Sequence, residues 1–198
     1  MGINKDDFVL GLCGRICKDK GIEELVNAFK LLKEKDPEQS YKLVLIGKED
    51  ARQGFSEITK NEILNNPDII NIGPVKHSIL PEYYSIMDLF VFPSYREGFP
   101  TVILETSAME IPVLVSKSHG CIDSIIPDET GEYMDSITPE AICEGIIKMK
   151  NNPNRKQLGR NGRQHVVKNY DHTVLWPLYK DFYQSLENKD SNKKSSHN

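Results

Sequence analysis

The sequence predicts an α/β domain built on a doubly wound parallel sheet. Short apolar runs, typical of buried strands, alternate along the chain with longer stretches whose apolar residues recur every three or four positions, as in an amphipathic helix. A single helical stretch separates the first two runs, and such a unit with short connections favours a parallel pair of strands joined by a right-handed crossover. Repetition of this unit indicates a parallel sheet with helices on both faces.

The individual elements follow from this alternation. The run FVLGLC at 8–13 ends at Gly14, and the helical stretch at 22–35 carries charges on the face opposite its apolar residues. Pro100 stands at the start of a helix, where the amide that proline lacks would be unsatisfied anyway. The predicted strands are 8–13, 41–46, 69–72, 89–92, 113–115 and a short extended piece at 131–134. The predicted helices are 22–35, 80–87, 101–110, 139–150, 154–169 and 173–186.

Length and composition restrict the class of protein. The 198 residues suffice for one full domain and are too few for two sizeable ones. Hydrophobic residues make up 38% and charged residues 27%, which is ordinary for a soluble globular protein. The net charge of −4 argues against a non-specific nucleic-acid binder, so an anionic ligand must meet a local basic site. Because no apolar run could span a bilayer and the N-terminus has no signal-peptide core, we expect a cytoplasmic protein.

The C-terminal part of the chain divides in two. The helix at 173–186 is rich in bulky side chains, among them Trp176 and Phe182, and is expected to pack on another surface. The segment 187–198, ENKDSNKKSSHN, has no apolar residue and is expected to be a disordered tail, so residues 1–186 are predicted to form the domain. The four cysteines lack the paired spacing of a metal site; buried or incidental thiols are expected, and no metal.

The first candidate site lies after the first strand. In an open parallel sheet, ligands bind beyond the carboxyl ends of the strands, so the loops after the strands are expected to share one rim. The first loop holds Gly14 and Arg15, then Lys20 and Gly21 directly before a helix. Two cations near a helix N-terminus suit phosphate oxygens, because charge-assisted hydrogen bonds add to the helix dipole. The alternative is a solvated basic loop.

The loop after the strand at 89–92 is the most informative segment, PSYREGFPTVILE. Gly98 would let the backbone approach a ligand closely, and Thr101 and Val102 would offer free first-turn amides to a phosphate. Glu97 and Glu105 stand eight positions apart, and Glu105 lies one turn further along the helix, within reach of a hydroxyl group such as those of a ribose. The alternative is that Glu97 is a surface charge and Glu105 an ordinary helix carboxylate.

These segments together resemble a known family. GRICKDKGIEELVNAF (14–29), LVLIG (43–47), DLFVFPSYREGFPTVILE (88–105) and the loops at Gly120 and Thr130 resemble, in this order, the C-terminal donor-binding domain of the retaining GT-B glycosyltransferases grouped as glycosyltransferase family 4. The resemblance covers residues 8–186 and is nearest to the transferases of capsule, O-antigen and other surface polysaccharides. It implies a Rossmann-like fold, the C-terminal half of a GT-B enzyme.

The resemblance also implies a role for each matching position. Arg15 and Lys20 match the pair that grips the diphosphate of the sugar nucleotide and stabilises the leaving group. Glu97 matches the residue that contacts the transferred sugar, and Glu105 the one that binds the ribose hydroxyls. The implied catalytic residues are Arg15, Lys20 and Glu97. The implied substrate-binding residues are Gly14, Arg15, Lys20, Pro74, Val75, Glu97, Gly98, Phe99, Pro100, Thr101, Val102 and Glu105, with Pro74 and Val75 lining the nucleobase.

The chain departs from the family pattern in one loop. Where many members have Gly-Gly-x-x-Glu after the fifth strand, this chain has Gly120 and Cys121, with Asp123 as the carboxylate, so the side chain there is one methylene shorter. His77 and His119 could be read as acid/base residues, although loop histidines are common at such places. No cofactor and no metal are expected.

The implied partners are a nucleoside-diphosphate sugar, with UDP favoured, and an N-terminal domain that binds the acceptor. On this prediction the chain is the donor half of a transferase of hexosyl or N-acetylhexosaminyl type, inactive alone, whose full enzyme lies at the inner face of the membrane through the other domain. Self-association through the aromatic helix is also expected. The alternative is a nucleotide-sugar-binding module that needs a separate acceptor domain. Another doubly wound domain is disfavoured, because no G-x-G-x-x-G follows the first strand.

Overall fold

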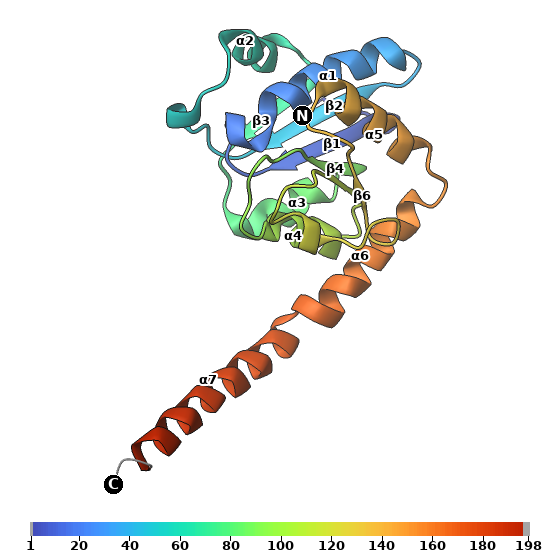
Figure 1. The fold of residues 1–198 in the computed structure, drawn as a ribbon. Coiled ribbons are helices and arrows are strands. Elements are labelled where there is room, and N and C mark those ends of the chain that lie inside the picture. The colour runs from blue at the N-terminus through green and yellow to red at the C-terminus, as the bar shows by residue number, and fades with distance from the viewer. Residues whose placement is uncertain (1, 196–198) are drawn as a thin grey trace.

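The structure is a computed structural model that describes residues 2–195, with side chains for all of these except 51 and 187–195. Its centre is one six-stranded sheet with the strand order β3-β2-β1-β4-β5-β6 (Figure 1). Every neighbouring pair of strands is parallel. The predicted doubly wound parallel sheet is therefore confirmed.

The central strands are buried because helices cover both faces of the sheet. β1, β4 and β5 consist entirely of buried residues, as expected for strands that read as continuous apolar runs. β1 pairs with β2 along its full length, from Phe8 opposite Tyr41 to Cys13 opposite Ile46. The strands are β1 (Phe8–Cys13), β2 (Tyr41–Ile46), β3 (Ile69–Gly73), β4 (Leu89–Phe92), β5 (Val113–Val115) and β6 (Glu132–Tyr133).

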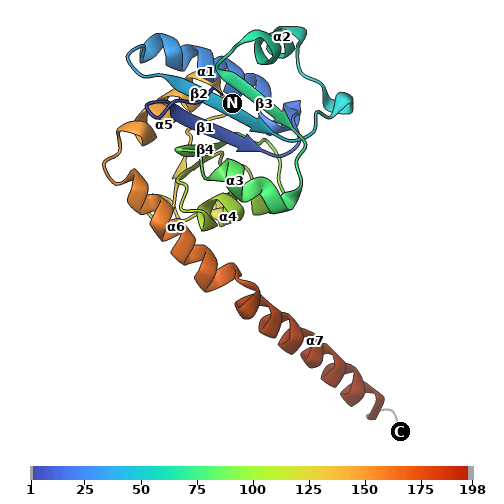
Figure 2. The same cartoon turned by 180° about the vertical axis from the view of Figure 1, so that it is seen from behind.

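Helices α1 and α5 lie on one face of the sheet, and α3, α4 and α6 lie on the other (Figures 1 and 2). The α-helices are α1 (Ile22–Lys35), α2 (Glu57–Asn65), α3 (Leu80–Tyr84), α4 (Thr101–Ala108), α5 (Pro139–Asn151), α6 (Arg155–Tyr170) and α7 (His172–Ser195). Four short 3-10 helices complete the described elements: η1 (Lys18–Lys20), η2 (Ala51–Gln53), η3 (His77–Ile79) and η4 (Ile122–Ser124).

Two helices end earlier than predicted, and one was not predicted. α3 stops at Tyr84 and α4 at Ala108, where Glu110 adopts a left-handed backbone conformation (φ 62°) that no helix can continue through. α2 escaped prediction because only Thr59 and Ile63 of its residues are buried, which leaves a weak apolar periodicity. The side chain of Ser56 caps its first turn by accepting a hydrogen bond from the amide of Thr59.

The last helix projects from the domain as an arm (Figures 1 and 2). Trp176, Tyr179, Phe182 and Tyr183 are all exposed on α7, so the predicted helix is present, but these aromatic side chains do not pack on the domain, and the helix contacts α6 where the two meet. Its backbone stays helical to Ser195, where a disordered tail was expected from residue 187. Lysine and glutamate in that segment favour helix, and an existing helix extends at little cost. Residues 196–198 lie outside the described part.

Candidate functional site

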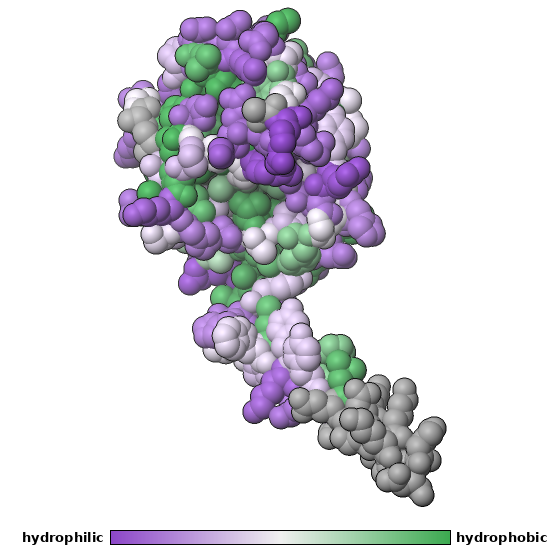
Figure 3. Space-filling model, turned by 90° about the vertical axis from the view of Figure 1, so that its left-hand side faces the viewer, coloured by the Kyte–Doolittle hydropathy of each residue, from purple (hydrophilic) through white to green (hydrophobic). Residues whose placement is uncertain are grey.

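The predicted ligand-binding residues lie where the sheet reverses its strand order. From β1 the chain continues outward through β2 and β3, whereas β4 is followed by β5 and β6 on the opposite side. The loops at 14–21 and 93–100, which follow β1 and β4, therefore run in opposite directions and leave a crevice beyond the carboxyl ends of these strands. In open α/β sheets this crevice is the place where ligands bind. Figure 3 looks onto this side of the molecule, where polar residues surround a band of hydrophobic ones.

Contacts between backbones hold the loops of this rim together. A Cβ on Gly47, just after β2, would lie 1.7 Å from the carbonyl oxygen of Gly14. A Cβ on Gly120, after β5, would lie 2.4 Å from the carbonyl oxygen of Gly98. No side chain fits at such distances, so glycine at these two positions lets four loops approach one another and fixes the shape of the crevice.

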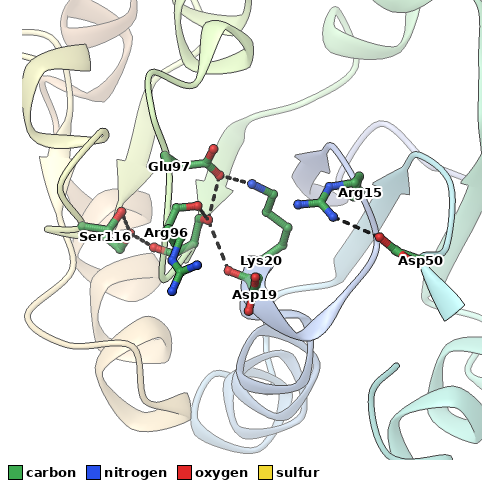
Figure 4. A network of polar contacts seen from close by, with 9 residues as sticks. Arg15, Asp19, Lys20, Asp50, Arg96, Glu97 and Ser116 are labelled. Carbon is green, nitrogen blue, oxygen red and sulfur yellow. Dashed lines mark hydrogen bonds and ion pairs between the residues drawn. The ribbon is translucent and has the colours of Figure 1, made fainter. Parts of the chain in front are cut away.

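Lys20 and Glu97 form an ion pair across the crevice (Figure 4). The two side chains are only 11% and 13% exposed. The hydroxyl of Ser94, a fully buried residue, donates a hydrogen bond of 2.7 Å to Oε1 of Glu97. The Lys20 ammonium also lies 5.6 Å from the centre of the Phe92 ring, in a cation–π contact. The structure thus brings together two residues that are 77 positions apart in the sequence.

Arg15, the other predicted cation, is exposed and has a different carboxylate partner. Its Nη1 lies 3.0 Å from Oδ2 of Asp50, in the loop after β2 (Figure 4). Hydrogen bonds from Arg52 and from Arg15 lower the pKa of Asp50 to about 2, so this carboxylate is charged at neutral pH. Arg15, Lys48 and Asp50 line a hollow of about 420 Å³. Sequence reasoning missed Asp50, which no motif marks.

The carboxylate of Glu105 is held from two sides. The Tyr84 hydroxyl, at the end of α3, donates a hydrogen bond of 2.9 Å to Oε2. Nε2 of His77 lies 3.3 Å from Oε1, and the hydroxyl of Thr101 donates a hydrogen bond of 3.5 Å to the same oxygen. The Glu105 side chain is 30% exposed, so it stays open to a ligand. Tyr84 was also missed, and His77 lies beside a predicted binding residue.

The remaining predicted residues are spread along the rim. Pro74 lines a pocket of about 270 Å³ between α2 and the loops after β2 and β3, and Val75 packs against the core. Phe99 has its ring centre 5.7 Å from that of Tyr170 in α6, and the residue stays 42% exposed. The start of α4 holds the last three: Pro100, Thr101 and Val102.

Several other side chains bear on the predictions. Cys13, Cys17, Cys121 and Cys143 are free and buried. Asp123 lies exposed in η4, and His119 is exposed in the loop after β5. Among residues 2–195, no three His, Cys, Asp or Glu side chains gather as a metal site would require. In the same part of the chain, no helix combines the length and apolar character needed to cross a bilayer.

Comparison with known sequences places the chain in a family. The family model for glycosyl transferases group 1 matches residues 1–165. The capsular polysaccharide biosynthesis glycosyltransferase CapM of Staphylococcus aureus is 35% identical over 93% of this chain and 49% of its own length. An α-1,3-N-acetylgalactosaminyltransferase of Campylobacter jejuni, named for a diphospho-undecaprenol substrate, is 27% identical over 94% of this chain and 46% of its own. The chain spans about half the length of the curated relatives it matches.

Solved structures share the fold. Sucrose-phosphate synthase of Thermosynechococcus elongatus superposes with a TM-score of 0.79 at 27% identity, covering 93% of this chain and 46% of that one. The C-terminal domain of the group 1 glycosyltransferase LpcC of Francisella tularensis gives 0.72 at 25% identity, covering 83% and 86%. Anabaena HepE in complex with UDP and glucose gives 0.76 at 18% identity, covering 90% and 48%, which bears on the fold alone. The chain belongs to the group 1 glycosyltransferases and has the Rossmann-like fold of the C-terminal half of a GT-B enzyme.

Proposed function

We propose that this chain binds the donor of a glycosyl transfer, a sugar carried on a nucleoside diphosphate, with UDP as the favoured nucleotide. The observation that carries the proposal is the buried pair of Lys20 and Glu97 at the strand-order reversal. A fixed cation beside a carboxylate suits a phosphate that is joined to a sugar, because the ammonium can bind the phosphate oxygens and the carboxylate the sugar hydroxyls. Membership of the family supports this assignment, as does the UDP held by HepE.

The cations of the crevice are assigned to the leaving group. When the bond between the anomeric carbon and the diphosphate oxygen breaks, the bonding electrons leave with the diphosphate. Lys20, Arg15 and the first-turn amides of α4 are positioned to stabilise the charge that develops there, without a metal. The transfer is proposed to retain the anomeric configuration, as the resemblance implies.

The other parts of the donor are assigned along the same rim. Glu97 receives hydroxyls of the transferred sugar, and Glu105 the ribose hydroxyls. The backbone at Pro74 and Val75 lines the nucleobase. A hexose or N-acetylhexosamine is proposed as the transferred sugar, since relatives include an N-acetylgalactosaminyltransferase and a lipopolysaccharide N-acetylglucosaminetransferase. The acceptor is proposed to be a growing surface polysaccharide or a lipid-linked sugar, on the names of CapM and the Campylobacter relative.

Acceptor binding is assigned to a companion domain. The curated relatives are about twice as long as the part that this chain matches, and α7 presents exposed aromatic side chains that would suit docking against another domain. On this proposal the present chain binds the donor by itself but transfers sugar only beside the companion. A nucleotide-sugar-binding module without its own turnover is the second candidate, and assays with and without an added acceptor domain separate the two.

Calorimetry with the UDP, GDP and ADP forms of one sugar tests the proposal. We expect the UDP sugar to bind most tightly, and its affinity to be unchanged by a chelator, because the positive groups of the crevice belong to the protein. The result against the proposed metal-free site would be binding that disappears in chelator and returns with Mg²⁺ or Mn²⁺. If none of the three ligands binds, the donor assignment itself is wrong.

The arm is expected to make the chain self-associate. An exposed helix that carries Trp176, Phe182 and Tyr183 leaves an apolar surface, and such surfaces favour association in water. Light scattering over a concentration series should show association for the full chain and a monomer for a folded chain cut after Asn169. A full chain that stays monomeric at every concentration contradicts this expectation.

A further inference from the structure

A buried tyrosine lies behind the carboxylate assigned to the ribose. Tyr84 is only 2% exposed, and its hydroxyl donates to Oε2 of Glu105 at 2.9 Å. A buried hydroxyl needs a hydrogen-bond partner, and Glu105 supplies it. Burial raises the pKa of the Tyr84 hydroxyl well above its usual value, so the hydroxyl keeps its proton and remains a donor at neutral pH.

The two oxygens of Glu105 have different surroundings. Oε2 accepts from the buried Tyr84, while Oε1 lies 3.3 Å from His77, whose side chain is 81% exposed, and accepts a long hydrogen bond of 3.5 Å from the hydroxyl of Thr101, which is also exposed. One oxygen is therefore fixed toward the core and the other faces the open rim. Because an exposed side chain such as His77 keeps more rotamer freedom than one packed in the core, Tyr84 is the contact that can set the orientation of the carboxylate.

Tyr84 also connects Glu105 to the sheet. The thiol of Cys13, the last residue of β1, lies beside the Tyr84 hydroxyl and contributes to its raised pKa. The hydroxyl thus stands between the carboxyl end of β1 and helix α4. A glutamate has several rotatable bonds, and holding it in one orientation before the ligand arrives lowers the entropy lost on binding.

We propose that Tyr84 is a positioning residue: its hydroxyl orients the Glu105 carboxylate so that this carboxylate can receive the two hydroxyls of a ribose. The proposal rests on the assignment of Glu105 to the ribose of the donor nucleotide. A carboxylate offers enough lone pairs to accept from Tyr84 and from both hydroxyls of a cis-diol at once.

The test is a double-mutant cycle read by calorimetry. Glu105→Gln is expected to weaken UDP by roughly ten-fold or more, the loss of a hydrogen bond to a charged group, and to leave inorganic diphosphate unaffected. Tyr84→Phe keeps the ring in the core and should weaken UDP about three- to ten-fold. In the double variant the second change should add almost nothing, because Tyr84 acts through Glu105.

One further ligand and one further variant separate positioning from a general structural role. Tyr84→Phe should leave the affinity for 2′,3′-dideoxy-UDP unchanged, since that ligand has no ribose hydroxyls. Tyr83→Phe removes a hydroxyl from the preceding position of α3 and is the matched control, expected to bind UDP as the parent does. Equal losses of UDP and dideoxy-UDP in Tyr84→Phe, or effects that add in the double variant, would overturn the proposal.

The same binding data distinguish a failure of the positioning role from a failure of the proposed function. If Glu105→Gln weakens UDP selectively while Tyr84→Phe matches the parent, only the positioning role is wrong. If Glu105→Gln weakens UDP and inorganic diphosphate alike, the ribose assignment is wrong and the role of Tyr84 with it. Thermal unfolding of each variant shows whether a loss of affinity comes from a loss of folded protein.

Discussion

Lys20→Ala is expected to remove measurable UDP binding and to lower the free energy of unfolding by about 3–5 kcal/mol. Binding is lost because Lys20 is the buried cation of the crevice. Stability falls because Glu97, only 13% exposed, keeps its charge without its ionic partner. Calorimetry with UDP and urea unfolding followed by circular dichroism measure the two effects.

A variant that removes both charges separates these effects. Lys20→Met combined with Glu97→Gln leaves no unpaired charge, and the amide oxygen introduced by the second change can still accept the hydrogen bond from Ser94. Most of the lost stability should return, while UDP binding stays absent. A Lys20→Ala protein that binds UDP as the parent does would show that the cation is structural. A double variant as unstable as Lys20→Ala would mean that the ion pair is not the source of the loss.

Gly47→Ala is expected to destabilise the domain by about 3 kcal/mol or more, because the new Cβ would collide with the backbone of the first loop. That Cβ would lie 1.7 Å from the Gly14 carbonyl oxygen. A backbone atom, unlike a side chain, cannot relieve the collision by changing rotamer. The backbone of Gly47 also has a positive φ of 144°, which side chains rarely tolerate. Urea unfolding of the variant measures the loss.

Gly73→Ala is the matched control for this collision. Its backbone also has a positive φ, 76°, but no described atom lies within 4 Å of the position of a Cβ. Gly73→Ala should therefore lower the free energy of unfolding only by the conformational strain of a side chain at this φ, about 1–2 kcal/mol. Similar losses in the two variants would mean that the contact between the loops contributes little, and that the rim can relax without harm to the fold.

The order and type of the main elements could be predicted because the central strands are buried on both faces and the long helices bury one face. The bounds predicted for β1, α1, β2, β4 and β5 agree with the structure, since each apolar run or apolar periodicity stops where polar residues, glycine or proline follow. α2 could not be predicted in this way, because it lies at the margin of the core and buries only two side chains. The end of α7 was missed for a related reason: an extending helix needs no buried face.

The candidate site was predictable in its charges but not in its contacts. The sequence could place Arg15, Lys20, Glu97 and Glu105 at one rim, because ligands bind beyond the carboxyl ends of the strands in an open parallel sheet. The order of strands and helices along the chain is enough to apply this rule. The hydrogen bond from Tyr84 to Glu105 joins residues 21 positions apart in the sequence. Such a partner follows from how separate segments of the chain come together in the fold, and no periodicity in the sequence reports it. Ser94 and Asp50 escaped prediction for the same reason.

The carboxylates that accompany the two cations give the crevice a selectivity of its own. Lys20 is paired with Glu97 and Arg15 with Asp50, so a ligand does not meet two free positive charges. It has to displace anions that are tethered to the protein and therefore always present beside the cations. We expect a chloride or a single phosphate, which can contact only one of the two cations, to gain too little in that exchange to bind tightly. On the proposed function, a diphosphate can bridge both cations and so complete the exchange, and a sugar attached to it would give the displaced Glu97 new hydroxyl partners, so the paired carboxylates would favour the whole donor over smaller anions.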